Sequence, residues 1–373
     1  MVAARPVRRA VPIAALASAL AQAGVAQEGD DTTLGSDDVS APVASTVPSS
    51  GAIASSAGFG SYDLERPDGM APFGVFQDRV LRRGEWAVGY RFRRTHMRGM
   101  RDGVQRIPDE TVVSPDGFGF ARTPTEMIRN EHRIQGLFGA TERVTLAAIL
   151  PILGLEMDLL TSAGETFETK SSGLGDIGLA ALVSLHDSVT SRVHVNLGIT
   201  APTGSIDERG GPPAVGGQRE ILPYPMQLGS GTWDLRPGLT ATGCGDRWSW
   251  GGQLLGTLRM GRNSRGYSLG DRLDVTGWTA YRATQRLSLS GRIAIGRVTN
   301  VDGADRDLDP NASPPPNPTL QAGTRVDGLV GLNVLLARGS RLGMEIGWPI
   351  AQRLSGPQLQ TNVLWTLGLQ LAF

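Results

Sequence analysis

Long segments with alternating apolar and polar residues are the feature of this sequence that most limits its fold. From Gly84 onward, segments of ten or more residues place an apolar side chain at every second position, and turn residues separate these segments. A period of two is typical of β-strands whose two faces meet different surroundings. In the first segment, one face carries Trp86, Val88, Tyr90 and Phe92, and the other carries Arg91 and Arg93.

About twelve such segments follow one another, which predicts an all-β fold. They lie at residues 84–97, 126–140, 143–152, 173–185, 192–202, 231–242, 247–260, 271–282, 286–297, 323–336, 341–351 and 360–373. Each segment is about as long as the ~9–11 residues that a tilted strand needs to cross a bilayer. Bacterial single-chain barrels have an even number of strands, so we expect an antiparallel transmembrane β-barrel of about twelve strands.

The links between the segments give an independent indication. After the even-numbered segments the chain turns within a few residues, at Thr141-Glu142, His186–Ser191, Gly243–Asp246, Ala283–Gln285 and Ala337–Ser340. After the odd-numbered segments we expect longer links, at Arg98–Thr125, Leu153–Ser172, Thr203–Ser230, Gly261–Gly270, Val298–Ala322 and Gln352–Leu359. Short periplasmic turns and longer extracellular loops are typical of outer-membrane barrels.

A sheet that crosses lipid must have no free edge, because lipid offers no partner to backbone N–H and C=O groups. We therefore expect the last strand, Leu359 to Phe373, to pair antiparallel with Gly84–Met97. Its predicted lipid face is Leu359, Val363, Trp365, Leu367, Leu369, Leu371 and Phe373, and its polar face is Gln360, Asn362, Thr366 and Gln370. Aromatic residues near strand ends fit interfacial girdles, namely Trp86, Tyr90, Trp233, Trp248, Tyr281, Trp348, Trp365 and Phe373.

The chain before the barrel divides into two predicted parts. Residues 1–26 read as a secretory signal peptide, with a basic start, a short apolar run and small residues before cleavage after Ala26. Residues 27–75 are predicted to be a flexible periplasmic segment, because the stretch to about Ser61 is rich in Ser, Ala, Gly, Asp and Thr. The barrel itself is predicted to span residues 76–373, in the bacterial outer membrane.

Overall composition excludes several classes of protein. The net charge is zero, so nothing draws the chain toward nucleic acid. No apolar stretch reaches the ~18 residues of a transmembrane helix. Cys244 is the only cysteine, so no intramolecular disulfide is possible.

Several short stretches resemble a known family. They are Ser171–Leu179 with its Gly-Leu-Gly-Asp, Leu197–Ser205 with its Pro-Thr-Gly, Leu222–Thr232, Trp248–Gly251, Asn300–Asp305 and Gly356–Leu359. Together they resemble the outer-membrane transporter family named for the meta pathway of phenol degradation (MetA-pathway), over roughly residues 70 to 373. The resemblance implies an outer-membrane transporter or channel without established catalytic residues.

The sequence offers weak patterns for three kinds of site: a soft-metal site, a hydrolase site and a calcium loop. Some relatives carry Met- and His-rich stretches near the first strand that suggest soft-metal binding; here only His96, Met97 and Met100 remain, which favours ordinary strand-end residues. A hydrolase would need a Ser–His pair, and none of His96, His132, His186 and His194 has an obvious serine partner; His132, on the outward face, is the candidate to test. Asp302, Asp305, Asp307 and Asp309 resemble the start of a calcium loop without its closing Glu, which favours a solvated extracellular loop.

Charged residues on the predicted inward faces are the candidate lumen lining. They are Arg91, Arg93, Arg129, Glu131, Arg133, Asp176, His194, Asp234, Arg236, Arg259, Arg272, Asp274, Arg292, Asp327 and Glu345. Charged rings set selectivity in a pore, but mixed charges can also fill a narrow lumen. We therefore expect passive passage of small solutes, with a plugged structural or ligand-binding barrel and an outer-membrane hydrolase as alternatives. No cofactor, metal or enzymatic activity is expected; the expected partners are outer-membrane lipid and lipopolysaccharide, a small-molecule cargo and the barrel-assembly machinery, which reads the terminal aromatic.

Overall fold

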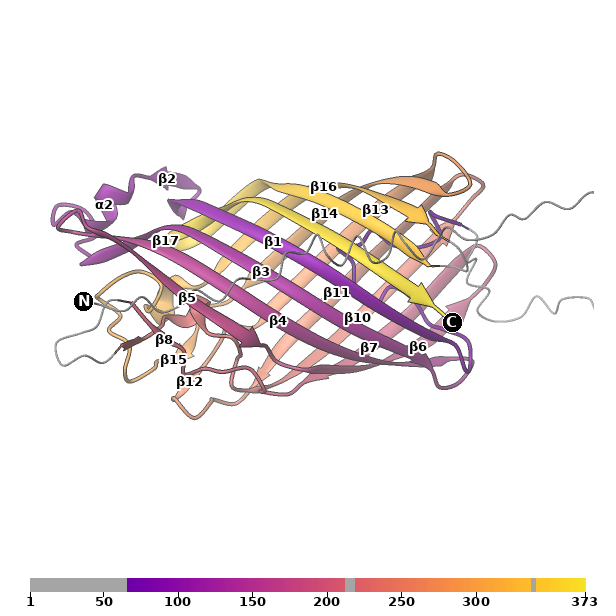
Figure 1. Cartoon of the computed structure of the whole chain (residues 1–373), viewed down its shortest axis with the longest axis horizontal. Helices are drawn as coiled ribbons and strands as arrows, with labels where there is room; N and C mark the ends of the chain where they lie inside the picture. The colour runs from indigo at the N-terminus through magenta and orange to yellow at the C-terminus, as the bar shows by residue number, and fades with distance from the viewer. Residues whose placement is uncertain (1–65, 212–218, 337–339) are drawn as a thin grey trace, which may run out of the picture. The chain divides into compact units, whose positions relative to one another are not determined.

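A computed structural model describes residues 66–211, 219–336 and 340–373, which form a closed antiparallel β-barrel (Figure 1). The long strands are β1 (Trp86–Gly103), β3 (Arg122–Gly139), β4 (Val144–Thr161), β5 (Thr166–Leu174), β6 (Gly178–Asp187), β7 (Ser191–Thr200), β10 (Trp233–Cys244), β11 (Trp248–Met260), β13 (Arg272–Arg282), β14 (Leu287–Val298), β16 (Gly323–Leu335) and β17 (Arg341–Ala372). The short elements are β2 (Gln105–Ile107), α2 (Asp109–Val113), β8 (Arg209–Gly210), β9 (Glu220–Ile221), η1 (Tyr224–Met226), β12 (Tyr267–Ser268), β15 (Asp302–Gly303) and η2 (Pro318–Leu320).

Eleven of these strands close the ring, in the order β1, β3, β4, β6, β7, β10, β11, β13, β14, β16 and β17, and β17 pairs with β1. β5 pairs with the same edge of β4 as β6, so these two strands together make one crossing. β17 makes two crossings, because residues 341–354 pair with β16 and residues 358–372 pair with β1. Gly356, with φ +79°, lies where it folds back. The eleven strands thus give twelve crossings, which confirms the predicted fold class.

Closure runs along the full length of β1. The amide of Trp86 donates to the carbonyl of Phe373 (3.2 Å) and the amide of Phe373 donates to the carbonyl of Trp86 (2.9 Å). The predicted pairing of the last strand with the first is therefore confirmed. The predicted faces of Leu359 and Asn362 are wrong, because the register shifts between His96 and Met97 and passes over Asn362, whose side chain is exposed. Beyond this bulge Leu359 packs against a buried apolar cluster instead of facing lipid.

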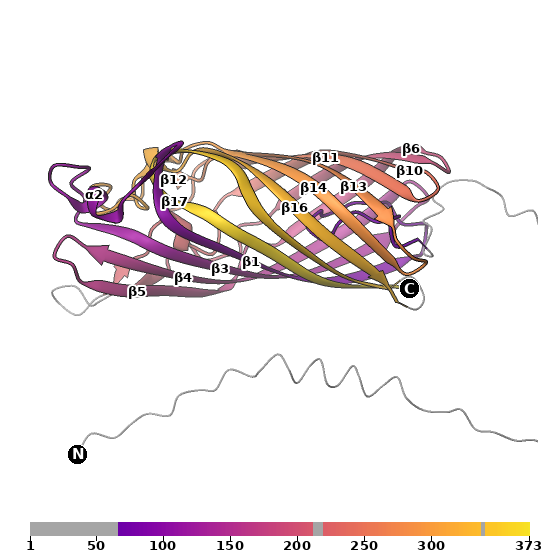
Figure 2. The same ribbon diagram turned by 90° about the horizontal axis from the view of Figure 1, so that it is seen from above.

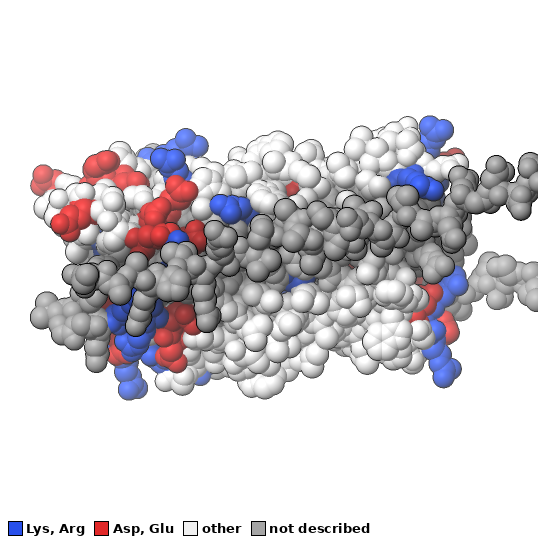
Figure 3. Space-filling view, viewed as in Figure 1, with Lys and Arg blue, Asp and Glu red and all other residues white. Residues whose placement is uncertain are grey.

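An apolar belt surrounds the barrel. Figure 3 shows charged side chains gathered near its two ends, with an uncharged band between them. Leu146, Leu179, Leu197 and Leu289 are among the apolar side chains that the strands expose. Trp86, Trp233, Trp248, Trp348 and Phe373 are each at least 50% exposed, as expected of girdle residues. This outer surface is suited to lipid.

The two ends of the barrel differ in the length of their links. Short turns lie at one end, here called the turn end, where β1 starts and the chain ends; the longer links lie at the other, here called the loop end. The predicted turns at the turn end are confirmed where the structure describes them. Two of the predicted long loops are wrong: Leu153–Thr161 and Thr166–Ser172 belong to strands joined at 162–165, and β17 continues through Gln352–Leu359. The hairpin of β4 and β5 extends past the apolar belt into water. Its outward side chains there include Glu156, Glu168 and Lys170, so the apolar alternation in the sequence ends before the strands do.

No helix among the described residues is long and apolar enough to cross a membrane. The predicted signal peptide, 1–26, and residues 27–65 lie outside the described residues. Residues 66–75, which the sequence analysis placed in the flexible segment, lie inside the barrel, as the next section describes.

Candidate functional site

Residues 66–85, here called the plug, enter the barrel at its turn end before β1 begins (Figure 2). Wall side chains from strands around the ring donate hydrogen bonds to plug carbonyl groups. The pairs are Arg91–Val75, His194–Gln77, Gln253–Phe76, Ser249–Asp68, Ser288–Pro67 and Arg341–Ala71. Because β1, β7, β11, β14 and β17 all contribute, the plug lies across the lumen.

Phe73 is the apolar anchor of the plug. Its ring lies against Gly343 and Gly368 of β17, where a Cβ atom would come within 2.0 Å of the ring at either position. The guanidinium groups of Arg341 and Arg91 lie 4.5 and 5.5 Å from the ring centroid. Glycine is required at both wall positions because the ring fills the space of a side chain. The result is a socket that fits one aromatic ring.

Phe76 lies among three arginines of β1 and β3. The guanidinium carbons of Arg133, Arg91 and Arg93 lie 3.9, 4.4 and 5.4 Å from its ring centroid. Cations over an aromatic face gain more when they are shielded from water. The adjoining Gln77 has φ +55°, an uncommon backbone conformation for a residue with a side chain. The plug is thus held in a defined conformation rather than loosely filling the lumen.

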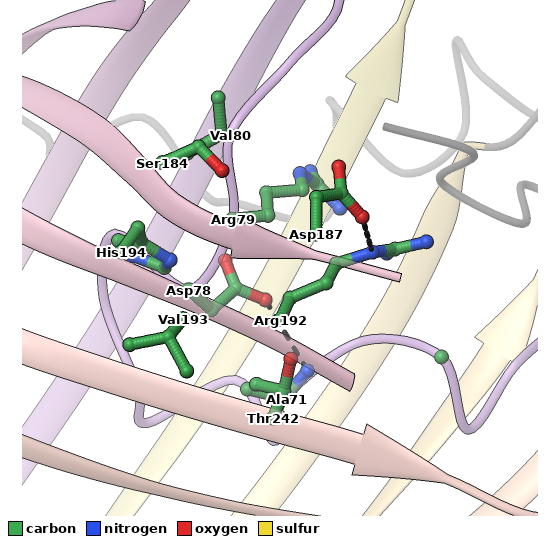
Figure 4. A pocket seen from close by; sticks show the side chains of 11 residues that line it. Ala71, Asp78, Arg79, Val80, Ser184, Asp187, Arg192, Val193, His194 and Thr242 are labelled. Carbon is green, nitrogen blue, oxygen red and sulfur yellow. Dashed lines mark hydrogen bonds and ion pairs between the residues drawn. The ribbon is translucent and has the colours of Figure 1, made fainter. Parts of the chain in front are cut away.

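Figure 4 shows a small cavity between the plug and the wall of β6, β7 and β10. Its volume is about 30 Å³, which suits a water-sized occupant rather than a solute. Asp78 lies beside it, accepts from the amide of Ala71 (3.2 Å) and lies 3.5 Å from the guanidinium of Arg341.

Inward orientation was predicted for fifteen charged residues, and the structure shows most of them paired. The ion pairs are Arg133–Glu131, Arg259–Asp234, Arg272–Asp274, Arg292–Glu345 and, with a residue that the sequence analysis did not select, Arg325–Asp327. Arg91 and Arg93 donate to plug carbonyl groups, as does His194. Arg129 and Arg236 lie on the same inward faces of β3 and β10 as buried residues, but they have no ion pair among the described residues.

Asp176 has a different role from the predicted one. It accepts hydrogen bonds from the amides of Gly204 (2.8 Å) and Ser230 (2.7 Å), and from the Ser230 hydroxyl (2.9 Å). These contacts tie the link between β7 and β10 to the wall. Asp176 therefore positions a loop.

Loops from three links are joined at the loop end. Arg265 pairs with Asp305, and also with Asp207 (2.8 Å) and Asp307 (2.8 Å). Arg262 pairs with Asp302 at 2.9 Å. Three of the four aspartates that suggested a calcium loop thus have arginine partners, and the described residues contain no group of ligands suited to a metal ion. We call the set of Arg265 and its three aspartates the loop latch.

Apolar side chains line the lumen beneath this latch. The inward face of β4 carries Leu153, Leu155, Met157 and Leu159, all buried, and they pack against Leu222, Met226 and Leu228 of the link between β7 and β10. In this stretch the inward face is apolar and the outward face carries Glu156 and Asp158, the reverse of the pattern within the belt. Sequence analysis treated most of this stretch as a loop and so missed its inward face.

The histidines do not form the sites considered earlier. His96 bonds Glu126 (2.9 Å) on the opposite face of β1 from Met97, which packs inward. His132 bonds the hydroxyl of Tyr90 (2.8 Å) and has no serine partner among the residues that the structure describes. His186 does lie 3.1 Å from Ser191, but in a turn at the turn end. Neither the metal site nor the hydrolase site is brought together.

Comparison with known proteins places the barrel among its relatives. Residues 125–313, half of the chain, match the model of the family described as "Putative MetA-pathway of phenol degradation". The chain belongs to this family. The MetA-pathway resemblance seen in the sequence is thereby confirmed, and no curated protein sequence matches the chain.

A solved outer-membrane channel shares the fold of this MetA-pathway family member. An outer membrane channel from Pseudomonas putida F1 matches with a TM-score of 0.54 and 15% identity, covering 80% of this chain and 99% of the channel. The P. putida toluene transporter TodX matches with a TM-score of 0.40 and 10% identity, covering 78% and 89%. The fold, with its apolar belt, is that of a bacterial outer-membrane channel, which supports location in the outer membrane.

Proposed function

We propose that this protein is a passive outer-membrane channel for small solutes, and that the plug closes its lumen until it moves. The observation that carries the proposal is the way in which the plug is attached. Up to Arg83 its contacts with the wall are side-chain hydrogen bonds, aromatic packing and ion pairs, and backbone pairing with β3 begins only at Gly84 and Glu85. Individual hydrogen bonds of this kind contribute about 0.5–1.5 kcal/mol each, so the plug can leave without unfolding the barrel.

The loop latch closes the opposite end in this proposal. Arg265 joins links that come from different parts of the ring, so solute must pass between these loops or displace them. Cargo then crosses the lumen between the latch and the plug along the charged wall. The protein's other proposed partners are lipid and lipopolysaccharide around the belt, and the assembly machinery that reads Phe373.

Solute flux into proteoliposomes tests the function. We expect the refolded protein to admit a small solute slowly, and Phe73→Ala to admit it several times faster, because the socket no longer retains the plug. If folded Phe73→Ala admits no more solute than protein-free liposomes, the channel proposal fails. The alternative, a plugged structural or ligand-binding barrel, would then be favoured.

A further inference from the structure

The inward-facing arginines outnumber the carboxylates that pair with them. Arg91, Arg93, Arg129 and Arg236 have no carboxylate within ion-pair distance among the residues that the structure describes. Arg91 and Arg93 are satisfied in part by the carbonyl groups of Val75 and Gly74. Arg129 and Arg236 also have no hydrogen-bond acceptor among the residues that the structure describes. The lumen therefore carries positive charge that the wall does not neutralise.

Most of these side chains lie in one region of the lumen, on β1 and β3. Arg93 is opposite Glu131 in the register, and Arg129 is opposite the adjacent inward residue, Thr95. Arg133, two inward positions from Arg129, shares the ring of Phe76 with Arg93. Arg236 lies on the inward face of β10, and its neighbouring charges include those of Arg133 and Asp274. Four guanidinium groups thus face the lumen in this region, beside two carboxylates, Glu131 and Asp274, that already pair with Arg133 and Arg272.

Unused donors point to a ligand in that space. The Nε atoms of Arg93 and Arg133 are buried and have no acceptor in the described part of the chain. A buried donor left without an acceptor is destabilising, and more so when it is charged. A buried charge also requires a counter-charge. An anion among these arginines would supply both the missing hydrogen-bond acceptors and the missing counter-charge.

We infer that Arg93, Arg129, Arg133 and Arg236 form a binding site for an oxyanion, a carboxylate or a phosphate group, inside the lumen. Guanidinium groups present planar pairs of N–H donors that match two oxygens of either group. A point cation such as lysine would lack this match. In the proposed channel, the site gives cargo with an anionic group a favourable position in the lumen. That role rests on the proposed function, whereas binding itself does not.

Calorimetric titration tests the site directly. The full-length refolded protein, in an uncharged detergent at low salt, is titrated with succinate, with inorganic phosphate and with uncharged glucose. We expect both anions to bind, more weakly as salt increases, and glucose not to bind. Succinate and phosphate arms show which oxyanion fits better. Absence of heat from both anions would overturn the inference.

Matched variants locate the binding. Arg129→Gln/Arg236→Gln should weaken anion affinity at least about tenfold, since each lost charge-assisted hydrogen bond contributes about 1.5–3 kcal/mol. Arg94→Gln is the control, because Arg94 lies on β1 next to Arg93 but bonds Asn130 on the outer face. Arg129→Lys/Arg236→Lys, which keeps both charges, should fold and retain part of the affinity. If the glutamine double variant is folded, by its heat-dependent gel mobility, and binds as the wild type does, the site is wrong. Anion binding without solute flux would leave this site standing and remove the channel proposal.

Discussion

Arg292 of β14 and Glu345 of β17 form a two-bonded ion pair over the inner face of β16, with Nε to Oε1 at 2.8 Å and Nη2 to Oε2 at 2.6 Å, and the plug backbone lies against it at Gly74. A Cβ atom at Gly74 would lie 2.1 Å from Oε2 and 2.2 Å from Nη2. Both side chains are buried, so neither can swing away into water. The plug backbone can therefore pack this closely against the ion pair only if position 74 is glycine.

Gly74→Ala should prevent the plug from seating. The added methyl group collides with a buried pair that is held by two hydrogen bonds, so we expect faster solute flux and faster protease cleavage within residues 66–85. Gly89→Ala is the matched control, because its Cβ would meet only the carbonyl of Leu369 at an ordinary 3.8 Å. Equal flux through the two variants would contradict the close approach at Gly74.

Breaking the pair itself should destabilise the barrel. Glu345→Gln leaves the buried Arg292 without its counter-charge, and removal of one member of a buried pair costs roughly 3–5 kcal/mol. Urea unfolding of the refolded protein in detergent should show this loss. Asp302→Asn, at the exposed pair with Arg262, should leave the unfolding midpoint unchanged. A Glu345→Gln midpoint equal to that of the wild type would argue against a structural role for the pair.

Acid should loosen the plug through Asp78. Burial alone would raise the pKa of this carboxyl, but the guanidinium groups of Arg79, Arg341 and Arg91 outweigh this effect, so its pKa lies below the ordinary value. A lowered carboxyl pKa stabilises the folded state above the ordinary value, about pH 4, and the stabilisation is lost as pH falls through the lowered value. His194 is the remaining titratable side chain known to interact with Asp78.

Tryptophan fluorescence can follow this release, because Trp278 packs against Ala71 and Val75 of the plug. We expect its signal to change below about pH 4 in the wild type. Asp78→Asn should already show the loosened signal at neutral pH and little further change in acid. An acid transition that is identical in both proteins would assign the effect to other carboxyl groups.

Arg265→Gln should open the loop latch. It leaves Asp207, Asp305 and Asp307 without the side chain that joins them, so the loops should be cut several times faster by a protease added from outside. Arg262→Gln removes an equal charge at a pair that is exposed on both sides and should have a smaller effect. Equal cleavage rates in these two variants would show that the latch does not hold the loops.

Strand positions in this protein were predictable because lipid imposes a strict period on them. The same rule failed where strands leave lipid: Glu156 and Lys170 face water, so the pattern ended while the strands continued. The β-bulge at Asn362 inserts one extra residue into the strand and so reverses the face of Leu359, which the alternation of residue types does not reveal. Arginines were correctly expected inside, yet their partners depend on register between strands.

The plug was the larger omission. Phe73, Val75 and Phe76 lie close together in a stretch otherwise rich in small and polar residues, and they were the available signal. No period marks the plug, because its chain follows the irregular inside of a finished barrel. Its place depends on Gly343 and Gly368, which lie far along the chain on β17 and which only the closed ring brings beside it.

Single-channel conductance in planar lipid tests the central claim, that the plug closes a conduit, most directly. The wild type should show small or rare openings, and Phe73→Ala/Phe76→Ala should show larger and more frequent ones, because both aromatic anchors are lost. Phe92→Ala, which removes a ring on the outer face of the same barrel, should behave as the wild type does. Silent membranes with the correctly folded double variant would contradict the account.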